Sequence, residues 1–395
     1  MNSGYQGLSD VDRAAEETIG TSLRVLHGGG IDDRGLGSAF DESGMERDLD
    51  CASTNEEAKI NKFTISMVRA ILLLAFTNHV LTAPLLAAPA IEVLGRDFVF
   101  PNQIVGMPGK LSDFKGLGIS SFRTNDGAKL SYWEAGSGKP LIFVPGWSSN
   151  GADYLNVMFL LSKKYRVLVL DPRNQGLSEN VDFGTRIARY GMDLKEFVDH
   201  LGLQQADFCG WSMGASVIWS YIDLFGTKSI RKAVFIDEPI SIYTHADWTE
   251  EERLNAGGMT TSPERMIAAF AGAPTNDMVV DMNVLHRAAE KGSPYFQNSQ
   301  AFAREFIKSD PGYMTRVLFD HVTNDWRDVV RSKIDVPTAI FTGQNSNNVP
   351  SQKWLQSAIE GSELYIYSAD EQGDHFLAFK NPVKFTNDLS SFLER

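Results

Sequence analysis

Cysteine is scarce in this sequence, and its scarcity limits the cross-links and metal sites that the chain can form. Only two cysteines occur among 395 residues, Cys51 near the N-terminus and Cys209 within an apolar run. A structural disulfide is not expected, and we interpret Cys209 as a small buried apolar residue. No metal-binding spacing of His, Cys or carboxylates, no phosphate loop and no dinucleotide fingerprint occurs. The sequence therefore predicts no metal and no cofactor.

A surplus of positive charge is also lacking, which excludes one class of partner. The formal net charge is −13, from 37 Lys and Arg against 50 Asp and Glu. Neutralising phosphates requires a basic face, so a nucleic-acid partner is not expected. Thirteen acidic and six basic residues fall in 1–62, which gives this stretch a net charge of −7. The remainder is only mildly acidic, which is usual for a protein surface.

The N-terminal region has no hydrophobic periodicity until residue 67. Residues 1–66 are rich in Gly, Ser, Asp and Glu, which predicts a disordered acidic tail. Residues 67–90 combine a short basic start, an apolar middle and small residues, the pattern of a secretory signal peptide. Either translation begins at Met67 and the protein is secreted, which we favour, or the run is an internal anchor or a packed arm. If translation does not begin at Met67, the protein is expected to be membrane-anchored or cytoplasmic.

Two observations leave the location and the partners of the chain open. Asn78, His79 and Pro84 weaken a membrane-spanning helix, so no firm membrane partner is predicted. The sequence contains no N-x-[ST] sequon that would support secretion. Residues 91–116 are expected to be a linker or an arm, and nothing in the sequence predicts the oligomeric state.

The regions 117–239 and 334–395 contain regularly spaced apolar runs that predict a parallel sheet. Runs that are continuous rather than alternating indicate strands buried on both faces by helices. A hairpin is predicted around the Asn-Asp-Gly turn at 125–127. The expected strands are 118–124, 129–134, 141–144, 166–170, 206–211, 232–236, 338–343 and 364–367. The predicted fold class is α/β, with a doubly wound, mostly parallel sheet.

Residues 240–333 interrupt the alternation of strands and helices and contain no convincing strand. Gly- and Pro-containing breaks divide this segment into several helices, which predicts a helical cap over the catalytic face. The segment is rich in Met and Phe, side chains that adapt to irregular apolar ligands. The predicted substrate pocket includes Trp211, Trp248, Met266, Phe270 and Phe376.

The stretch 206–216 contains the strongest chemical signal in the chain. An apolar strand ends at Trp211, Ser212 follows between Gly210 and Gly214, and a buried helix begins. A strand that reverses into a helix within one residue crowds the backbone, so glycines are needed on either side. This turn exposes the serine hydroxyl, and the N–H of Met213 at the helix start can stabilise an oxyanion.

A serine hydroxyl needs a base, and His375 is the best candidate among the seven histidines. It follows the last predicted strand, at the edge of the sheet where the carboxyl ends of the strands meet. A residue on that loop can reach a serine on the turn after 206–211. We therefore predict that His375 removes the proton of Ser212.

Four ordered motifs resemble the α/β-hydrolase superfamily over residues 117–395. They are 145–147 (PGW), 171–178 (DPRNQGLS), 210–214 (GWSMG) and His375 with Phe376 and 381–382 (NP). Within the superfamily they are similar to the branch of esterases, lactonases and cofactor-free haloperoxidases. The resemblance implies a Ser-His-acid triad, and an oxyanion hole made by the N–H groups of Met213 and Trp147. Asp171 and Arg173 are expected to tie loops together.

The acid of the triad departs from the usual pattern of that superfamily. Its common position lies three residues after the glycine that ends the penultimate strand, and this sequence has Ser346 there. Some members carry the acid after the strand that follows the nucleophile helix, which is Asp237 in this chain. We predict Asp237 as the acid. The alternatives are Glu238, Asp374 and Asn345.

These residues predict a serine hydrolase acting on a small apolar ester-like substrate. The expected substrate is a medium-sized carboxylic ester, lactone or thioester, cleaved through an acyl-enzyme on Ser212. Two alternatives remain open. One is a cofactor-free haloperoxidase or perhydrolase that uses the same triad, and the other is a non-catalytic ligand-binding relative.

Overall fold

A computed structural model describes residues 87–100, 104–245, 247–256 and 311–395, together with 293, 295, 301, 302, 305 and 307. The predictions for 1–66, for nearly all of 67–90 and for Met266 and Phe270 lie outside the described residues. Among the residues that are described, no helix is both long enough and apolar enough to cross a bilayer.

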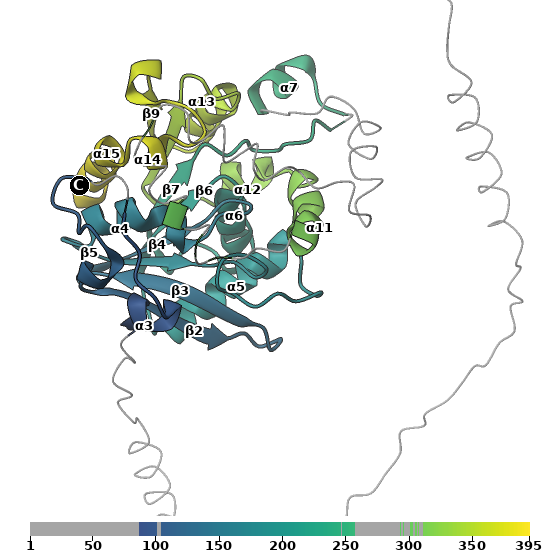
Figure 1. Ribbon diagram of the computed structural model, residues 1–395. Helices are drawn as coiled ribbons and strands as arrows, with labels where there is room; N and C mark the ends of the chain where they lie inside the picture. Colours follow the sequence, from purple (N-terminus) through teal and green to yellow (C-terminus); the bar gives the residue numbers. More distant parts are fainter. Residues whose placement is uncertain are drawn as a thin grey trace, which may run out of the picture. The chain divides into compact units, whose positions relative to one another are not determined.

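A nine-stranded, mostly parallel sheet organises the described part of the chain (Figure 1). In spatial order the strands are β1 (Ala88–Pro89), β2 (Leu117–Arg123), β3 (Lys129–Ala135), β5 (Tyr165–Leu170), β4 (Lys139–Val144), β6 (Ala206–Trp211), β7 (Ile230–Ile236), β8 (Thr338–Gly343) and β9 (Glu363–Tyr367). The pairs β1–β2, β2–β3 and β3–β5 are antiparallel, and all others are parallel. The predicted α/β fold class is confirmed.

Helices cover both faces of the sheet, and each face carries its own hydrophobic core (Figure 1). One core contains α4 (Leu155–Leu161), α14 (Leu377–Lys380) and α15 (Pro382–Glu394). The other contains α5 (Ile187–His200), α6 (Met213–Phe225), α12 (Arg327–Ser332) and α13 (Val349–Ala358). Within β6, Cys209 points into the first core and Phe208 into the second. This alternation explains why consecutive residues in the central strands, and not only every second one, are apolar.

Residues 91–116, expected to be a linker or an arm, pack against the first core. They contain α3 (Ala90–Leu94) and a 3₁₀ turn η1 (Leu111–Asp113). Five large apolar side chains of this region are at least 94% buried: Phe100, Ile104, Met107, Leu111 and Phe114. The small residues at the end of the predicted signal, Ala88, Pro89 and Ala90, form β1 and the start of α3.

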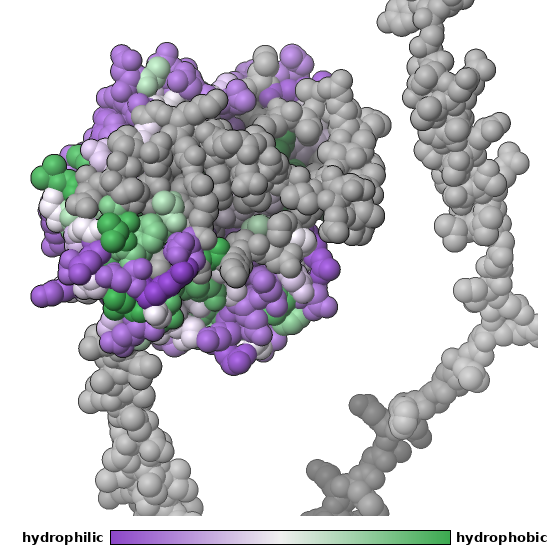
Figure 2. Space-filling view, viewed as in Figure 1, coloured by the Kyte–Doolittle hydropathy of each residue, from purple (hydrophilic) through white to green (hydrophobic). Residues whose placement is uncertain are grey.

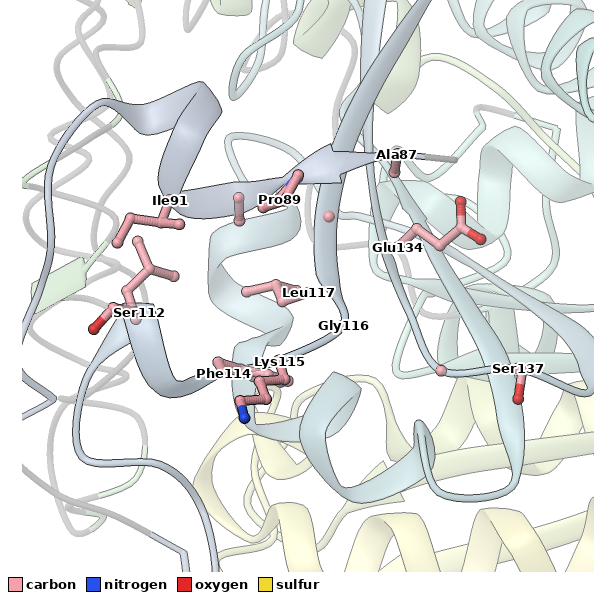
Figure 3. Close-up of a pocket in the computed structure, with 14 residues that line it drawn as sticks. Ala87, Pro89, Ile91, Ser112, Phe114, Lys115, Gly116, Leu117, Glu134 and Ser137 are labelled. Carbon is pink, nitrogen blue, oxygen red and sulfur yellow. The ribbon is translucent and has the colours of Figure 1, made fainter. Parts of the chain in front are cut away.

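A surface groove of about 660 Å³ lies between this arm and strands β2 and β3 (Figure 3). Its walls are mainly apolar, with Lys115 and Glu134 as charged members. None of its lining residues belongs to the predicted triad or oxyanion hole. Over the described surface seen in Figure 2, hydrophobic residues form small patches among hydrophilic ones, which is ordinary for a folded protein.

Candidate active site

Ser212 lies at a sharp turn between β6 and α6. Its φ of 52° is in a region that non-glycine residues rarely adopt, and its N–H donates to the carbonyl of Ile236 at 2.9 Å. A Cβ at Gly214 would lie 1.9 Å from the carbonyl oxygen of Val144, and one at Gly210 would lie 2.6 Å from Gly214. Only glycine fits at these two positions, which is the reason for the G-x-S-x-G sequence.

The structure brings Ser212, His375 and Asp237 into one hydrogen-bonded chain. His375 Nε2 lies 3.1 Å from Ser212 Oγ, and His375 Nδ1 lies 2.6 Å from Asp237 Oδ2. Asp237 is fully buried, whereas about a third of the His375 side chain is exposed. The indole N–H of Trp211 donates to the carbonyl of His375 at 2.7 Å and fixes the loop after β9.

Asp237 is held by several side chains of β8 and the loop that follows it. Its Oδ1 accepts a hydrogen bond from the Thr342 hydroxyl, and its Oδ2 accepts one from the Ser346 hydroxyl at 2.7 Å. Asn348 Nδ2 donates to Oδ2 at 3.2 Å and to the carbonyl of Asp237 at 2.9 Å. Burial opposes ionisation of Asp237, but His375 and the two hydroxyls outweigh it and keep its pKa below the ordinary value. The carboxylate is therefore ionised at neutral pH.

The three alternatives to Asp237, namely Glu238, Asp374 and Asn345, have other partners in the structure. Glu238 accepts a hydrogen bond from Ser216 at 3.2 Å, and its Oε1 lies 3.3 Å from His321 Nε2. Asp374 bonds the ammonium of Lys380 and the N–H of Phe376. The backbone N–H of Asn345 donates to Gly373. Of the four candidates, Asp237 is the one that contacts the His375 ring among the described residues.

The loop 145–148 lies directly against Ser212. A Cβ at Gly146 would be 2.9 Å from the Ser212 Cβ, so the backbone approaches as closely as a glycine allows. Met213 is the first residue of α6, and no hydrogen bond to its N–H or to that of Trp147 forms within the described ranges. The first N–H groups of a helix have no partner within the helix, so the position of Met213 is compatible with the predicted role of an oxyanion donor.

Gln175 and Trp147 fix this loop through side chains. Gln175 Oε1 accepts the N–H of Ser148, whose φ is 62°, and Gln175 Nε2 donates to the carbonyl of Gly146 at 3.4 Å. Trp147 Nε1 donates to the carbonyl of Met314 at 2.8 Å. The loop is thus held from the core on one side and from the segment between β7 and β8 on the other.

The residues predicted to line the substrate pocket are partly separated. Trp211 packs against Phe376, with ring centroids 5.4 Å apart, beside the His375 ring. Trp248 is buried between His245 and Arg327, and no contact with Ser212, His375 or Asp237 is formed within the described residues.

Asp171 and Arg173 tie loops together, as expected. Asp171 accepts the N–H groups of Gly151 at 2.7 Å, Leu177 at 2.8 Å and the Trp133 indole at 3.1 Å. Burial of Asp171 raises its pKa to about 7 despite these donors. The guanidinium of Arg173 is fully buried against Asp193 at 2.7 Å.

The sequence analysis did not identify the residues that hold Asp237 and the loop 145–148: Gln175, Thr342, Ser346 and Asn348. Two signals were available for them. Gln175 lies inside the motif 171–178, and Ser346 occupies the position where relatives usually carry the acid. Neither signal predicts which group Gln175 or Ser346 bonds, because a neutral polar side chain can form a hydrogen bond with any nearby polar group.

Comparison with known proteins gives the same family for most of this chain. The sequence profile of the alpha/beta hydrolase fold family matches residues 139–382. A non-heme haloperoxidase of Rhodococcus erythropolis is 26% identical over 286 residues, which cover 68% of this chain and 97% of that protein.

Two solved structures share the fold. A bromoperoxidase of Bacillus anthracis superposes with a TM-score of 0.58 at 23% identity, over 70% of this chain and 100% of the other. An esterase of a Rhodococcus species superposes with a TM-score of 0.57 at 21% identity, over 70% and 98%. At these identities the likeness shows the fold and leaves the reaction of this chain open.

Proposed function

This chain belongs to the α/β-hydrolase fold family, and from that premise we propose that it is a serine hydrolase of carboxylic esters, lactones or thioesters. The observation that carries the proposal is the chain of hydrogen bonds from Asp237 through His375 to Ser212, with distances of 2.6 and 3.1 Å. A hydroxyl in contact with an imidazole that is itself oriented by a buried carboxylate is the arrangement that activates serine.

The proposed reaction begins when Ser212 Oγ attacks the substrate carbonyl. His375 Nε2 accepts the hydroxyl proton, and the ionised Asp237 stabilises the imidazolium that forms. The N–H groups of Met213 and Trp147 stabilise the negative charge on the former carbonyl oxygen. His375 then protonates the leaving alcohol or thiol, which leaves an acyl-enzyme on Ser212. Water activated by His375 releases the acid and restores the serine.

The proposed substrate is medium-sized and apolar at the acyl group. Trp211 and Phe376 place aromatic surface beside His375, and the Trp147 side chain belongs to the loop against Ser212. Apolar walls with a few fixed polar groups are typical of small-molecule sites.

Perhydrolysis is a second candidate, favoured by the names of the relatives rather than by the site. The Rhodococcus protein is called a haloperoxidase and the Bacillus protein a bromoperoxidase. The same residues would serve, with peroxide in place of water in the second step. Acyl esters of graded chain length, assayed with and without hydrogen peroxide, separate the two reactions by whether a peracid forms.

Covalent labelling tests the proposal directly and separates an enzyme from a ligand-binding relative. A fluorophosphonate is expected to modify the chain at Ser212, as located by mass spectrometry of the adduct. Ser212→Ala is expected to abolish both labelling and ester turnover. Ser391→Ala, on the exposed face of α15, is the matched control and should behave as wild type. A wild-type chain that binds an ester without labelling or turnover would instead be a receptor.

A further inference from the structure

Helix α11 (Pro311–Val322), labelled in Figure 1, contacts both the loop after β4 and the end of β7. Towards its N-terminal end, the carbonyl of Met314 accepts the indole N–H of Trp147 at 2.8 Å. Towards its C-terminal end, His321 Nε2 lies 3.3 Å from Glu238 Oε1. Met314 and His321 are seven residues apart, so the two attachments are about 10 Å apart along the helix axis.

The two attachments lead to opposite sides of the candidate site. Trp147 carries one of the two proposed oxyanion donors, and its loop lies against Ser212. Glu238 directly follows Asp237 at the end of β7. Helix α11 therefore bridges the loop that would bind the oxyanion and the strand end that carries the acid.

The attachment at Glu238 is buried. His321 and Glu238 are each at least 96% buried. Burial lowers the pKa of His321 to about 3, so its imidazole is neutral at pH 7, and burial raises the pKa of Glu238 well above its ordinary value. Ser216 and Gln352 donate further hydrogen bonds to Glu238, at 3.2 Å to the side chain and 2.6 Å to the carbonyl.

A third contact fixes the direction of the helix. Asp320 Oδ2 accepts the N–H of Ile187 at 2.7 Å, at the start of α5, where Arg186 supplies no side-chain cap. Val317 is fully buried in the core on that face of the sheet. The C-terminal half of α11 is thus part of the core, which makes the helix a firm support for what its N-terminal half holds.

Within the described residues, the loop 145–148 is held by side-chain hydrogen bonds from Gln175 on one side and from the indole of Trp147 on the other. Ser148 adopts a φ of 62°, a strained value for a serine that the surroundings must maintain. Gln175 holds the core side of the loop through Ser148 and Gly146. The indole of Trp147 holds the other side, through Met314.

We propose that α11 positions the oxyanion hole, an inference that rests on the proposed function. The indole of Trp147 is the positioning group: it is bonded to α11, and it thereby fixes the backbone N–H of Trp147 relative to the helix. The side chain and the backbone of Trp147 then have separate roles. Because the C-terminal half of α11 is part of the core, the helix then fixes the position of the donor relative to Ser212.

The test compares Trp147→Phe with Trp354→Phe in the full-length chain. Phenylalanine keeps the backbone N–H and most of the ring but lacks the indole donor. The readout is the second-order rate of labelling by a fluorophosphonate, whose phosphoryl oxygen enters the oxyanion hole. Trp147→Phe is expected to lower this rate about tenfold or more, because loss of one oxyanion donor costs 10²- to 10³-fold and a displaced donor costs less.

Trp354→Phe is the matched control, because Trp354 lies in α13 and its indole packs on the guanidinium of Arg331 in α12. It should label at the wild-type rate. For an ester substrate, Trp147→Phe should lower kcat by a similar factor and leave KM within about threefold, since ground-state binding is retained. Melting temperatures of all variants show whether each is folded.

His321→Phe tests the bridge from its other end and serves if Trp147→Phe does not fold. His321→Phe should also lower the labelling rate. The labelling rate of the double variant should fall by a smaller factor than the product of the two single-variant factors. Two results would overturn this inference and leave the proposed function intact. One is a wild-type labelling rate in folded Trp147→Phe, and the other is a double variant whose loss of rate equals the product of the two single losses. A wild-type chain that is not labelled at Ser212 would overturn the proposed function, and this inference with it.

Discussion

Two residues of the candidate triad lie in backbone conformations that favour glycine. Ser212 has a φ of 52° and Asp237 a φ of 51°, at the ends of the neighbouring parallel strands β6 and β7. Each such residue costs of order 1–3 kcal/mol and persists only where the surroundings enforce it. In both places the unusual turn directs a side chain out of the sheet towards the His375 ring. Strain of this kind is common where a residue is held for chemistry rather than for packing.

Replacing Asp237 by asparagine tests the proposed acid. The amide cannot balance the charge of the imidazolium and favours the wrong tautomer of His375. By analogy with serine proteases, where the same change lowers kcat about 10⁴-fold, we expect a loss of that order in ester hydrolysis. Asp374→Asn is the control, because Asp374 bonds Lys380 rather than His375. A loss below tenfold in Asp237→Asn would move the role to Glu238, Asp374 or Asn345.

The depressed pKa of Asp237 predicts how acid affects stability. Its pKa is lower in the folded chain than the ordinary value of 3.8, so ionised Asp237 contributes stability above about pH 4. That contribution is lost as pH falls through the folded pKa. Between pH 7 and pH 3, the free energy of unfolding of Asp237→Asn should therefore fall less than that of wild type, as measured by urea titration. An equal or greater fall in the variant contradicts the assignment.

At the scale of elements, the turn between β6 and α6 depends on close backbone contact. Gly214→Ala places a methyl group 1.9 Å from the Val144 carbonyl, which α6 can relieve only by moving away from β4. We expect a loss of at least about 3 kcal/mol in the free energy of unfolding. Gly202→Ala is the control: Gly202 has a φ of 64° but no atom within 4 Å of the added Cβ. It should cost only about 1 kcal/mol.

The parallel strands could be predicted from the sequence because most contain a run of apolar residues between breaks, and β2 and β3 because they flank a hairpin turn. The predicted strand 206–211 has the same bounds as β6, and 338–343 the same bounds as β8. The two-residue strand β1 could not be predicted, because so short a segment shows no period and exists only through pairing with Gly118 and Ile119. Helix α14, with four residues, is likewise too short for a pattern.

The site could be predicted in part for a similar reason. Ser212 and His375 lie in motifs with fixed places in the fold, and Asp237 follows from the lack of a carboxylate between Gly343 and Glu360. The supports at Thr342, Ser346 and Asn348 depend on how β8 lies beside β7. Side-chain partners across two strands are a tertiary property that residue spacing alone does not specify.

At the scale of the whole molecule, the segment between β1 and β2 contributes to one of the two cores. The predicted hydrolase core begins at residue 117, but Phe100, Ile104, Met107, Leu111 and Phe114 are buried against that core. A chain that begins at Leu117 would expose the surface that these side chains cover. At about 1.5–3 kcal/mol for each buried side chain, the loss is roughly 10 kcal/mol. Most domains have a total stability of only about 5–15 kcal/mol.

We therefore expect residues 117–395 alone to be insoluble or to unfold well below the melting temperature of the full chain. Residues 87–395 retain the arm, β1 and both cores, and should melt within a few degrees of the full chain. Circular dichroism and calorimetry on the three proteins check both expectations. If 117–395 melted as the longer proteins do, the arm would be dispensable and its burial would contribute little. If 87–395 were unstable as well, the arm, β1 and the two cores would not be sufficient for the stability of the full chain.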